Sequence, residues 1–131
     1  MVKDIFSDMM GNNLPPNDPR TWESNRIAVD PRVSREVQTE ITAALLAAIA
    51  EFGFARGIHK TIGIYTLPII RLMTMLGAVP LWQSKTKKFP DSRCRIVFFA
   101  LTQSSHQTVL RKSKLTGPVI SHDWLQKEMA A

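Results

Sequence analysis

The stretch Thr21-Trp22-Glu23-Ser24-Asn25-Arg26-Ile27-Ala28-Val29-Asp30-Pro31 decides the fold, because it predicts a strand that breaks and leads into a long helix. Its aromatic and β-branched members favour a strand, namely Trp22, Ile27 and Val29. Pro31 prevents the ladder from continuing. The strand carries a carboxylate and a guanidinium three residues apart, Glu23 and Arg26. These charges are the candidates for chemistry, although such a pair also occurs as a structural ion pair.

A long helix is predicted over residues 34–53. Ser34 is a natural N-cap, and Glu36 lies in the first turn, where the helix dipole favours a carboxylate. Apolar residues at helical spacing predict a buried stripe: Val37, Ile41, Leu45, Ala48, Ile49 and Phe52. The alanine-rich middle allows close approach to a sheet. A second strand over 59–66 follows, so the order strand–helix–strand predicts a right-handed crossover between parallel strands.

The remaining sequence predicts further helices and strands. A helix is expected over 67–76, with Thr66 as its cap, and a strand over 78–84 that Pro80 restricts to a sheet edge. The apolar run 94–102 predicts a central strand, and residues 123–129 a short terminal helix. Residues 103–115 are polar and basic, and residues 1–20 predict an irregular lead-in. This pattern is typical of an α/β (α+β) fold with a mixed sheet flanked by helices.

The length and charge of the chain restrict its possible functions but do not select one. A chain of 131 residues has room for one domain, and its net charge of +6 favours an acidic partner such as a nucleotide, a phosphopantetheine arm, a carrier protein or nucleic acid. The basic loop around Lys87 is better explained as solvated than as a nucleic-acid site, because no nucleic-acid motif accompanies it. The three histidines are scattered without ligand spacing, so no metal site is expected.

The sequence also predicts a cytoplasmic location. Cys94 is the single cysteine, which excludes an intrachain disulfide and fits a reducing compartment. No run reaches the roughly 18 apolar residues that a membrane span needs. The first residues lack the cationic and then apolar build of a signal peptide.

The run Trp22–Val29, the alanine-rich helix, the strand ending in Thr66, and the helix carrying Arg71 and closed by Gly77 resemble the acyl-homoserine-lactone synthases. These are the autoinducer synthases of bacterial quorum sensing, which have a GNAT-like acyltransferase fold. The resemblance implies that residues 21–102 are the C-terminal part of such a domain, with the N-terminal part missing. Residues 103–131 would then be a polar C-terminal extension.

The resemblance also implies a reaction. An acyl group passes from acyl carrier protein, or from coenzyme A, to the amine of S-adenosylmethionine, and lactonisation then releases methylthioadenosine. S-adenosylmethionine is a substrate here, and no cofactor is implied. Glu23 matches the family's strand glutamate, the implied base or substrate-orienting group, and Arg26 matches the arginine that holds the site's charges. Thr66 matches a position that lines the acyl pocket in some members.

Two other interpretations stay open. Another GNAT-like acyltransferase using acyl coenzyme A would carry a Gln/Arg-x-x-Gly-x-Gly/Ala turn before the long helix, where this sequence has Val33-Ser34-Arg35-Glu36-Val37-Gln38. A non-catalytic basic module would bind nucleic acid or a carrier protein in a salt-sensitive way and would be indifferent to the loss of Glu23.

Overall fold

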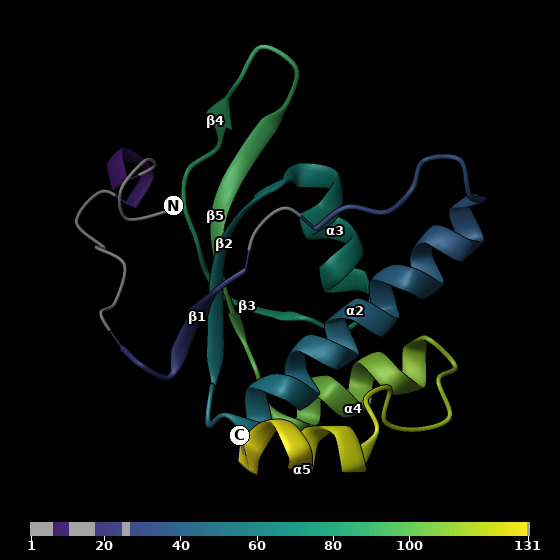
Figure 1. Cartoon of the computed structure of the whole chain (residues 1–131). Helices are drawn as coiled ribbons and strands as arrows, with labels where there is room; N and C mark the ends of the chain where they lie inside the picture. Colours follow the sequence, from purple (N-terminus) through teal and green to yellow (C-terminus); the bar gives the residue numbers. More distant parts are fainter. Residues whose placement is uncertain (1–6, 11–17, 25–26, 131) are drawn as a thin grey trace.

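A computed structural model of the chain describes residues 7–10, 18–24 and 27–130. Figure 1 shows its elements, which follow in the order η1 (Ser7–Met10), β1 (Thr21–Glu23), α2 (Arg35–Ala55), β2 (Lys60–Thr66), α3 (Leu67–Met75), β3 (Val79–Gln83), β4 (Lys87–Lys88), β5 (Arg93–Ala100), α4 (Gln103–Lys112) and α5 (His122–Ala130).

The strands form one mixed sheet in the order β1-β2-β5-β3, with β4 also paired to β5. β1 and β2 are parallel, with Thr21 opposite Lys60, whereas β5 is antiparallel to both β2 and β3. The predicted mixed sheet and the parallel crossover through α2 are therefore confirmed. β5 is central and β3, which contains Pro80, lies at the end of the strand order, as the sequence predicted.

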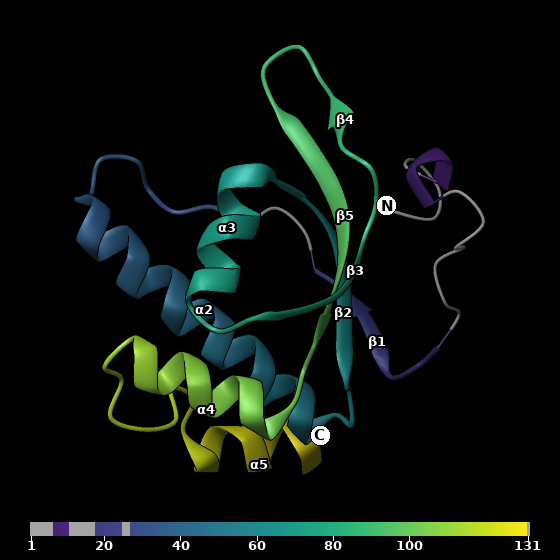
Figure 2. The same ribbon diagram turned by 180° about the vertical axis from the view of Figure 1, so that it is seen from behind.

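The helices and the N-terminal turn cover opposite faces of the sheet. Figures 1 and 2 show α2, α3 and α4 on one side of it and η1 on the other. The helix side holds two buried clusters, made of Tyr65, Ile70, Met73, Val97 and Phe99 and of Ala43, Ala47, Leu76 and Val109. On the other face Met10 packs against Ile62 and Ile96. The core of the domain thus lies mainly between the sheet and the three helices.

α2 buries the opposite face from the predicted one. Its N-cap is Ser34, as expected, and the Ser34 side chain accepts a hydrogen bond from the Val37 amide. The buried side of the helix is small, however, and consists of Thr42, Ala43, Ala47, Ala50, Glu51 and Gly53. Three members of the predicted core stripe are instead 38 to 39% exposed: Val37, Ile41 and Leu45. The alanines allow close approach to the sheet and to α4, so the small face packs and the larger one turns outward.

β1 is shorter than the sequence predicted. It pairs with β2 only over Thr21–Glu23, although the Ser24 amide still donates to the Ile62 carbonyl at 2.8 Å. Ile27 then packs against the buried cluster on the helix side of the sheet. β1 thus ends at Glu23, while β2 continues to Thr66.

The predicted polar extension after β5 begins with a helix, α4. Thr102 caps α4, because its hydroxyl accepts from the Ser105 amide at 3.0 Å while the Ser105 hydroxyl accepts from the Thr102 amide at 3.2 Å. Val109 of this helix is buried in the same core as α2 and α3. The first part of the predicted C-terminal extension therefore shares a core with the elements that precede it.

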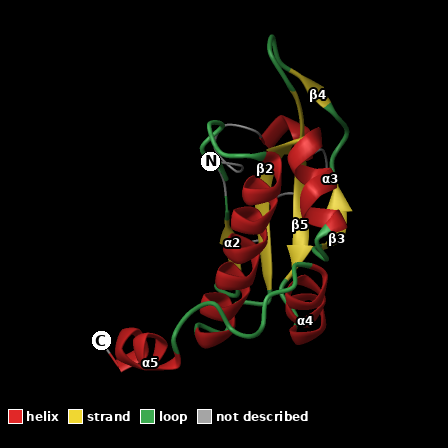
Figure 3. Ribbon diagram, turned by 90° about the vertical axis from the view of Figure 1, so that its right-hand side faces the viewer, coloured by secondary structure: helices red, strands yellow, loops and turns green. Residues whose placement is uncertain are grey.

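The predicted terminal helix is confirmed as α5, and the Ser121 hydroxyl accepts from the Trp124 amide at its start. Figure 3 shows α5 at the edge of the molecule, below the C-terminal end of α2. Among the described helices, α2 alone is long and apolar enough to cross a membrane, a test that core helices of soluble proteins also pass.

Candidate functional site

An apolar pocket lies beside Ser24, the residue that follows β1. It occupies about 40 Å³ between the sheet and helices α2, α3 and α4. Most of its wall is apolar and comes from Ile27, Leu46, Ile49, Ala50, Met73, Ala78, Phe99, Ala100, Leu101 and Val109. The remaining lining residues carry polar groups: Ser24, Thr61, Tyr65, Ser105 and His106. An apolar wall with a few polar groups is the usual make-up of a small-molecule site.

Gly63 allows the end of β1 to approach β2 closely. A Cβ atom at this position would clash with the Ser24 carbonyl oxygen and lie 2.5 Å from the Tyr65 hydroxyl. Any larger residue would therefore push Ser24 away from β2. A glycine within an otherwise apolar strand is the sequence signal for such an approach.

Tyr65 also holds Ser24 in place, through a hydrogen bond to its carbonyl. Its hydroxyl donates to the Ser24 carbonyl at 2.7 Å, and its ring packs edge-on against Phe99 with 5.8 Å between centroids. Burial raises the pKa of Tyr65 to about 12, the hydrogen bond to Ser24 opposes this rise, and the charge of Glu23 adds to it. The hydroxyl therefore stays protonated at neutral pH and holds the Ser24 carbonyl.

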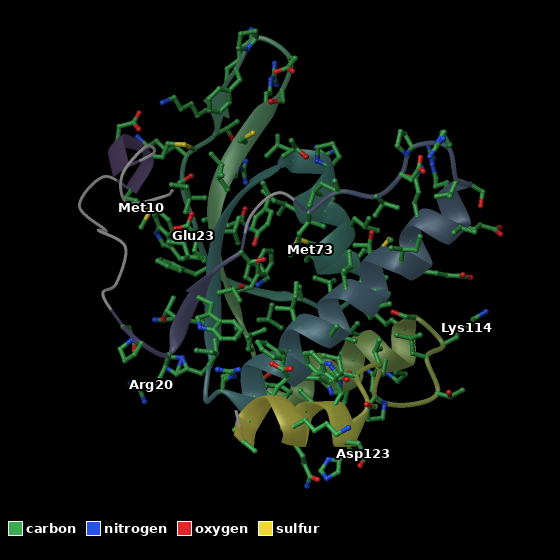
Figure 4. The ribbon with its side chains drawn as sticks, in the orientation of Figure 1. Met10, Arg20, Glu23, Met73, Lys114 and Asp123 are labelled. Carbon is green, nitrogen blue, oxygen red and sulfur yellow. The ribbon has the colours of Figure 1, made fainter. Side chains whose placement is uncertain are left out.

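Glu23 lies beside this point on an outer groove. The groove is lined by Trp22, Glu23, Ser24, Leu45, Ala48, Ile49, Phe52, Thr61, Ile120 and Trp124. Ser24, Ile49 and Thr61 line both the groove and the pocket, so the two spaces meet there. Figure 4 shows Glu23 on β1 and Met73 on α3. A carboxylate at this junction can accept a proton from a group placed at the mouth of the pocket.

Aromatic rings form the wall of the groove beyond Glu23. The Trp22 and Phe52 ring centroids are 5.5 Å apart, and those of Phe52 and Trp124 are 5.9 Å apart. The outward stripe of α2 therefore lines a groove rather than the core. Its members Leu45, Ala48, Ile49 and Phe52 all lie in this wall.

The three residues predicted for the site have different outcomes. Glu23 lies at the junction just described, whereas Arg26 is outside the described residues. Thr66 ends β2 and is the N-cap residue of α3, as predicted, although its side chain makes no capping hydrogen bond. Thr66 is also not among the residues that line the pocket, while Thr61 of the same strand is.

Sequence reasoning did not single out Ser24, Tyr65, Glu51 or His106 for the site. The last two form a buried pair, with His106 Nε2 2.8 Å from Glu51 Oε2, and His106 contributes to the pocket wall. The described residues contain no group of three or more His, Cys, Asp or Glu side chains that could hold a metal ion.

The strand order β1-β2-β5-β3, with a parallel β1–β2 pair beside an apolar pocket, defines a mixed sheet flanked by helices. Solved structures show the same architecture. The structure of a CoA-dependent acyl-homoserine lactone synthase, MesI, gives a TM-score of 0.79 at 16% identity, and the match covers 92% of this chain and 60% of that one. The synthase BjaI with MTA gives 0.71 at 17% identity over 100% of this chain and 63% of that one. LasI gives 0.69 at 16% identity, covering 93% and 59%.

Sequence comparison leads to the same family. The chain is 30% identical over 81 residues to an acyl-homoserine-lactone synthase of Aeromonas salmonicida, a match that covers 59% of this chain and 39% of the relative. The corresponding synthase of Aeromonas hydrophila is 28% identical over 81 residues. No model of a protein family matches the chain. By sequence and by fold the chain is related to the acyl-homoserine-lactone synthases, so the predicted resemblance is confirmed. The chain spans about two fifths of the length of the curated relatives that it matches.

Proposed function

We propose that this chain carries the acyl-transfer site of an acyl-homoserine-lactone synthase and acts in the cytoplasm. The observation that supports this most directly is the junction at Ser24, where an apolar pocket meets a groove that contains Glu23. An acyl chain would occupy the pocket, and its thioester carbonyl would lie at Ser24. The amine of S-adenosylmethionine, a substrate with no further cofactor required, would approach from the groove.

The proposed reaction has two steps, acyl transfer and then lactonisation. The amine lone pair attacks the thioester carbonyl, a carbon–nitrogen bond forms, and the carbon–sulfur bond breaks to release the donor thiolate. Glu23 accepts the amine proton directly or through one water. The carboxylate oxygen of the acylated S-adenosylmethionine then attacks its own Cγ. This closes the lactone, and methylthioadenosine leaves with the sulfur electrons.

Two acyl donors fit the proposed function, acyl carrier protein and coenzyme A. The net charge of +6 suits both an acidic carrier protein and the phosphates of coenzyme A. MesI and BjaI are described as CoA-dependent, and BjaI has been solved with SAM and isopentyl-CoA. We therefore propose an acyl thioester carried by phosphopantetheine, and the assay decides between acyl carrier protein and coenzyme A.

The test is methylthioadenosine release by the purified chain with S-adenosylmethionine and either acyl carrier protein or coenzyme A loaded with short acyl groups. Glu23→Gln should lower the rate by about 10²- to 10⁴-fold, the usual contribution of a general base. Glu36→Gln is a matched control, because Glu36 is also exposed but lies in the first turn of α2. Equal rates for wild type and Glu23→Gln would refute the role of Glu23.

A folded chain that releases no methylthioadenosine with either donor would contradict the proposal for this chain alone. The same chain joined to the N-terminal part of a characterised synthase then provides the second measurement. Release that depends on Glu23 in the fusion would assign the acyl-transfer site to this part. No release in the fusion would favour a non-catalytic module, which salt-sensitive binding without dependence on Glu23 would support.

A further inference from the structure

A buried polar pair lies at one end of the apolar pocket. His106 and Glu51 are joined by a 2.8 Å contact, and their side chains are 9% and 7% exposed. The Glu51 carboxylate also accepts from the backbone amides of Val119 and Ile120 at 2.9 and 2.8 Å. His106 lines the pocket, whereas Glu51 lies behind it. A ligand in the pocket therefore meets the imidazole and not the carboxylate.

The imidazole of His106 has a second ring nitrogen, Nδ1, besides the Nε2 that contacts Glu51. Because Glu51 already accepts from two backbone amides, its carboxylate acts as an acceptor and Nε2 of His106 carries the shared hydrogen. Within residues 7–10, 18–24 and 27–130, Nδ1 of His106 has no hydrogen-bond partner. This nitrogen accepts in the neutral imidazole and donates in the protonated one. A hydroxyl group can serve either form, since it both donates and accepts.

The neighbouring polar group of α4 does not compete for this role. The Ser105 hydroxyl is engaged with the Thr102 backbone, since it donates to the Thr102 carbonyl at 3.0 Å. The other hydroxyls of the pocket wall belong to Ser24, Thr61 and Tyr65. Ser24 and Thr61 lie where the pocket meets the groove, and the Tyr65 hydroxyl donates to the Ser24 carbonyl. The polar character of the inner end, beside the first turn of α4, therefore comes from His106.

The size and the two ends of the pocket indicate what it can hold. Its volume of about 40 Å³ is roughly three times the space that one water occupies, which suits a short group only. Ser24, next to Glu23, is bonded to Ile62 of β2, whereas Leu101 is bonded to His59, three residues earlier in the chain. Ser24 therefore lines the pocket at one level of the sheet, and Leu101, with His106 of α4, lines it at another. A short acyl group whose carbonyl lies at Ser24 would place its far end at His106.

We propose that His106 is a specificity-determining residue that selects a short acyl group bearing a hydroxyl on its last carbon. This inference rests on the proposed function, because it takes the pocket to be the acyl site. An alkyl end would bury Nδ1 without a partner, which is unfavourable, whereas a terminal hydroxyl would supply the missing hydrogen bond. Glu51 is a positioning residue, because it holds the ring through Nε2.

Binding of two product-like amides tests the proposal without requiring turnover. The probes are N-pentanoyl homoserine lactone and its counterpart with a hydroxyl on the last carbon, titrated into the full chain and followed by NMR signals of Ala50 and Leu101. We expect the hydroxylated probe to bind about tenfold more tightly, the scale of one hydrogen bond to a buried group. His106→Phe should abolish this ratio, and His106→Gln should restore part of it.

Thr61→Val is the matched control, because it removes a hydroxyl of the wall at the junction with the groove while keeping the shape of the side chain. The affinity ratio should survive this change. A ratio lost in Thr61→Val and kept in His106→Phe would overturn the role of His106. If His106→Phe does not fold, the ratio in the wild type and in His106→Gln decides.

The remaining outcomes separate this proposal from the proposed function. Equal affinity of the wild type for both probes would overturn selection by His106 and leave the pocket as an acyl site. Binding of neither probe would overturn both the selection and the assignment of the pocket to the acyl group.

Discussion

Alkaline pH should destabilise the fold through one identifiable group, the hydroxyl of Tyr65. This side chain is the only tyrosine of the chain and is 5% exposed. Burial raises its pKa to about 12, against about 10 in an unfolded chain. The unfolded state therefore loses this proton first as the pH rises. The contribution of Tyr65 to stability is fully present below about pH 10 and is lost between about pH 10 and 12.

The magnitude follows from the size of the shift. Two pKa units at about 1.4 kcal/mol each correspond to a loss of about 3 kcal/mol when the titration is complete. Half of this loss should be visible by about pH 11. At neutral pH the phenol also donates to the Ser24 carbonyl, so Tyr65→Phe should cost about 1 to 2 kcal/mol there by leaving that acceptor unpaired.

Urea unfolding of wild type and Tyr65→Phe, followed by tryptophan fluorescence between about pH 8 and 11.5, measures both effects. Lysine and arginine titrate alike in the two proteins, so the difference in unfolding free energy isolates the tyrosine. The advantage of the wild type should shrink by about 1 to 2 kcal/mol by pH 11 and then change sign. A constant difference across this range would refute the reasoning. So would a tyrosinate absorbance that rises near pH 10 in the folded wild type.

Three further changes test other contacts of the fold. Gly63→Ala should destabilise the chain and speed amide exchange at Ser24, because the added methyl group meets the Ser24 carbonyl; unchanged exchange would contradict the close approach. Glu51→Leu should cost about 3 kcal/mol and expose the Val119 and Ile120 amides to exchange, since it removes their acceptor; protected amides would contradict this anchor. Lys87→Ser should leave urea stability unchanged within error, because the Lys87–Asp8 bridge is solvent-exposed, and a clear loss would show a larger role.

The sequence was sufficient for those parts of the fold that depend on strong local signals. The apolar run 94–102 predicted the central strand, and Pro80 predicted an edge, because proline cannot donate to a ladder. The order strand–helix–strand predicted the parallel pair β1–β2. Each of these depends on hydropathy or on backbone chemistry that is visible in a few residues.

The orientation of α2 could not be read from hydropathy. Periodicity indicated the face with Val37, Ile41 and Leu45, whereas the face with Ala43 and Ala47 is buried. Two packing solutions compete for such a helix, and the shape of the neighbours decides between them. The face with small side chains is the buried one, because small side chains let the helix come close to the sheet and to α4.

The candidate site was predicted only in part for a similar reason. Glu23 could be named from its strand, but α4 carries few apolar residues, so its first turn and His106 were assigned to a polar segment. The signal that was available is the pair Thr102 and Ser105, whose hydroxyls cap the helix reciprocally. Capping chemistry predicts a helix start even where hydropathy is weak.

One carboxylate connects the two spaces of the site. Glu51 holds His106 at the end of the pocket and the amides of Val119 and Ile120, while Ile120 lines the groove that contains Glu23. The pocket and the groove therefore share an anchor on α2 as well as the junction at Ser24. A substitution at Glu51 should disturb both ends of the site together, whereas His106→Gln should disturb the pocket alone. If the segment 119–120 exchanged its amides equally fast in both variants, the anchoring would lie in the imidazole and not in the carboxylate.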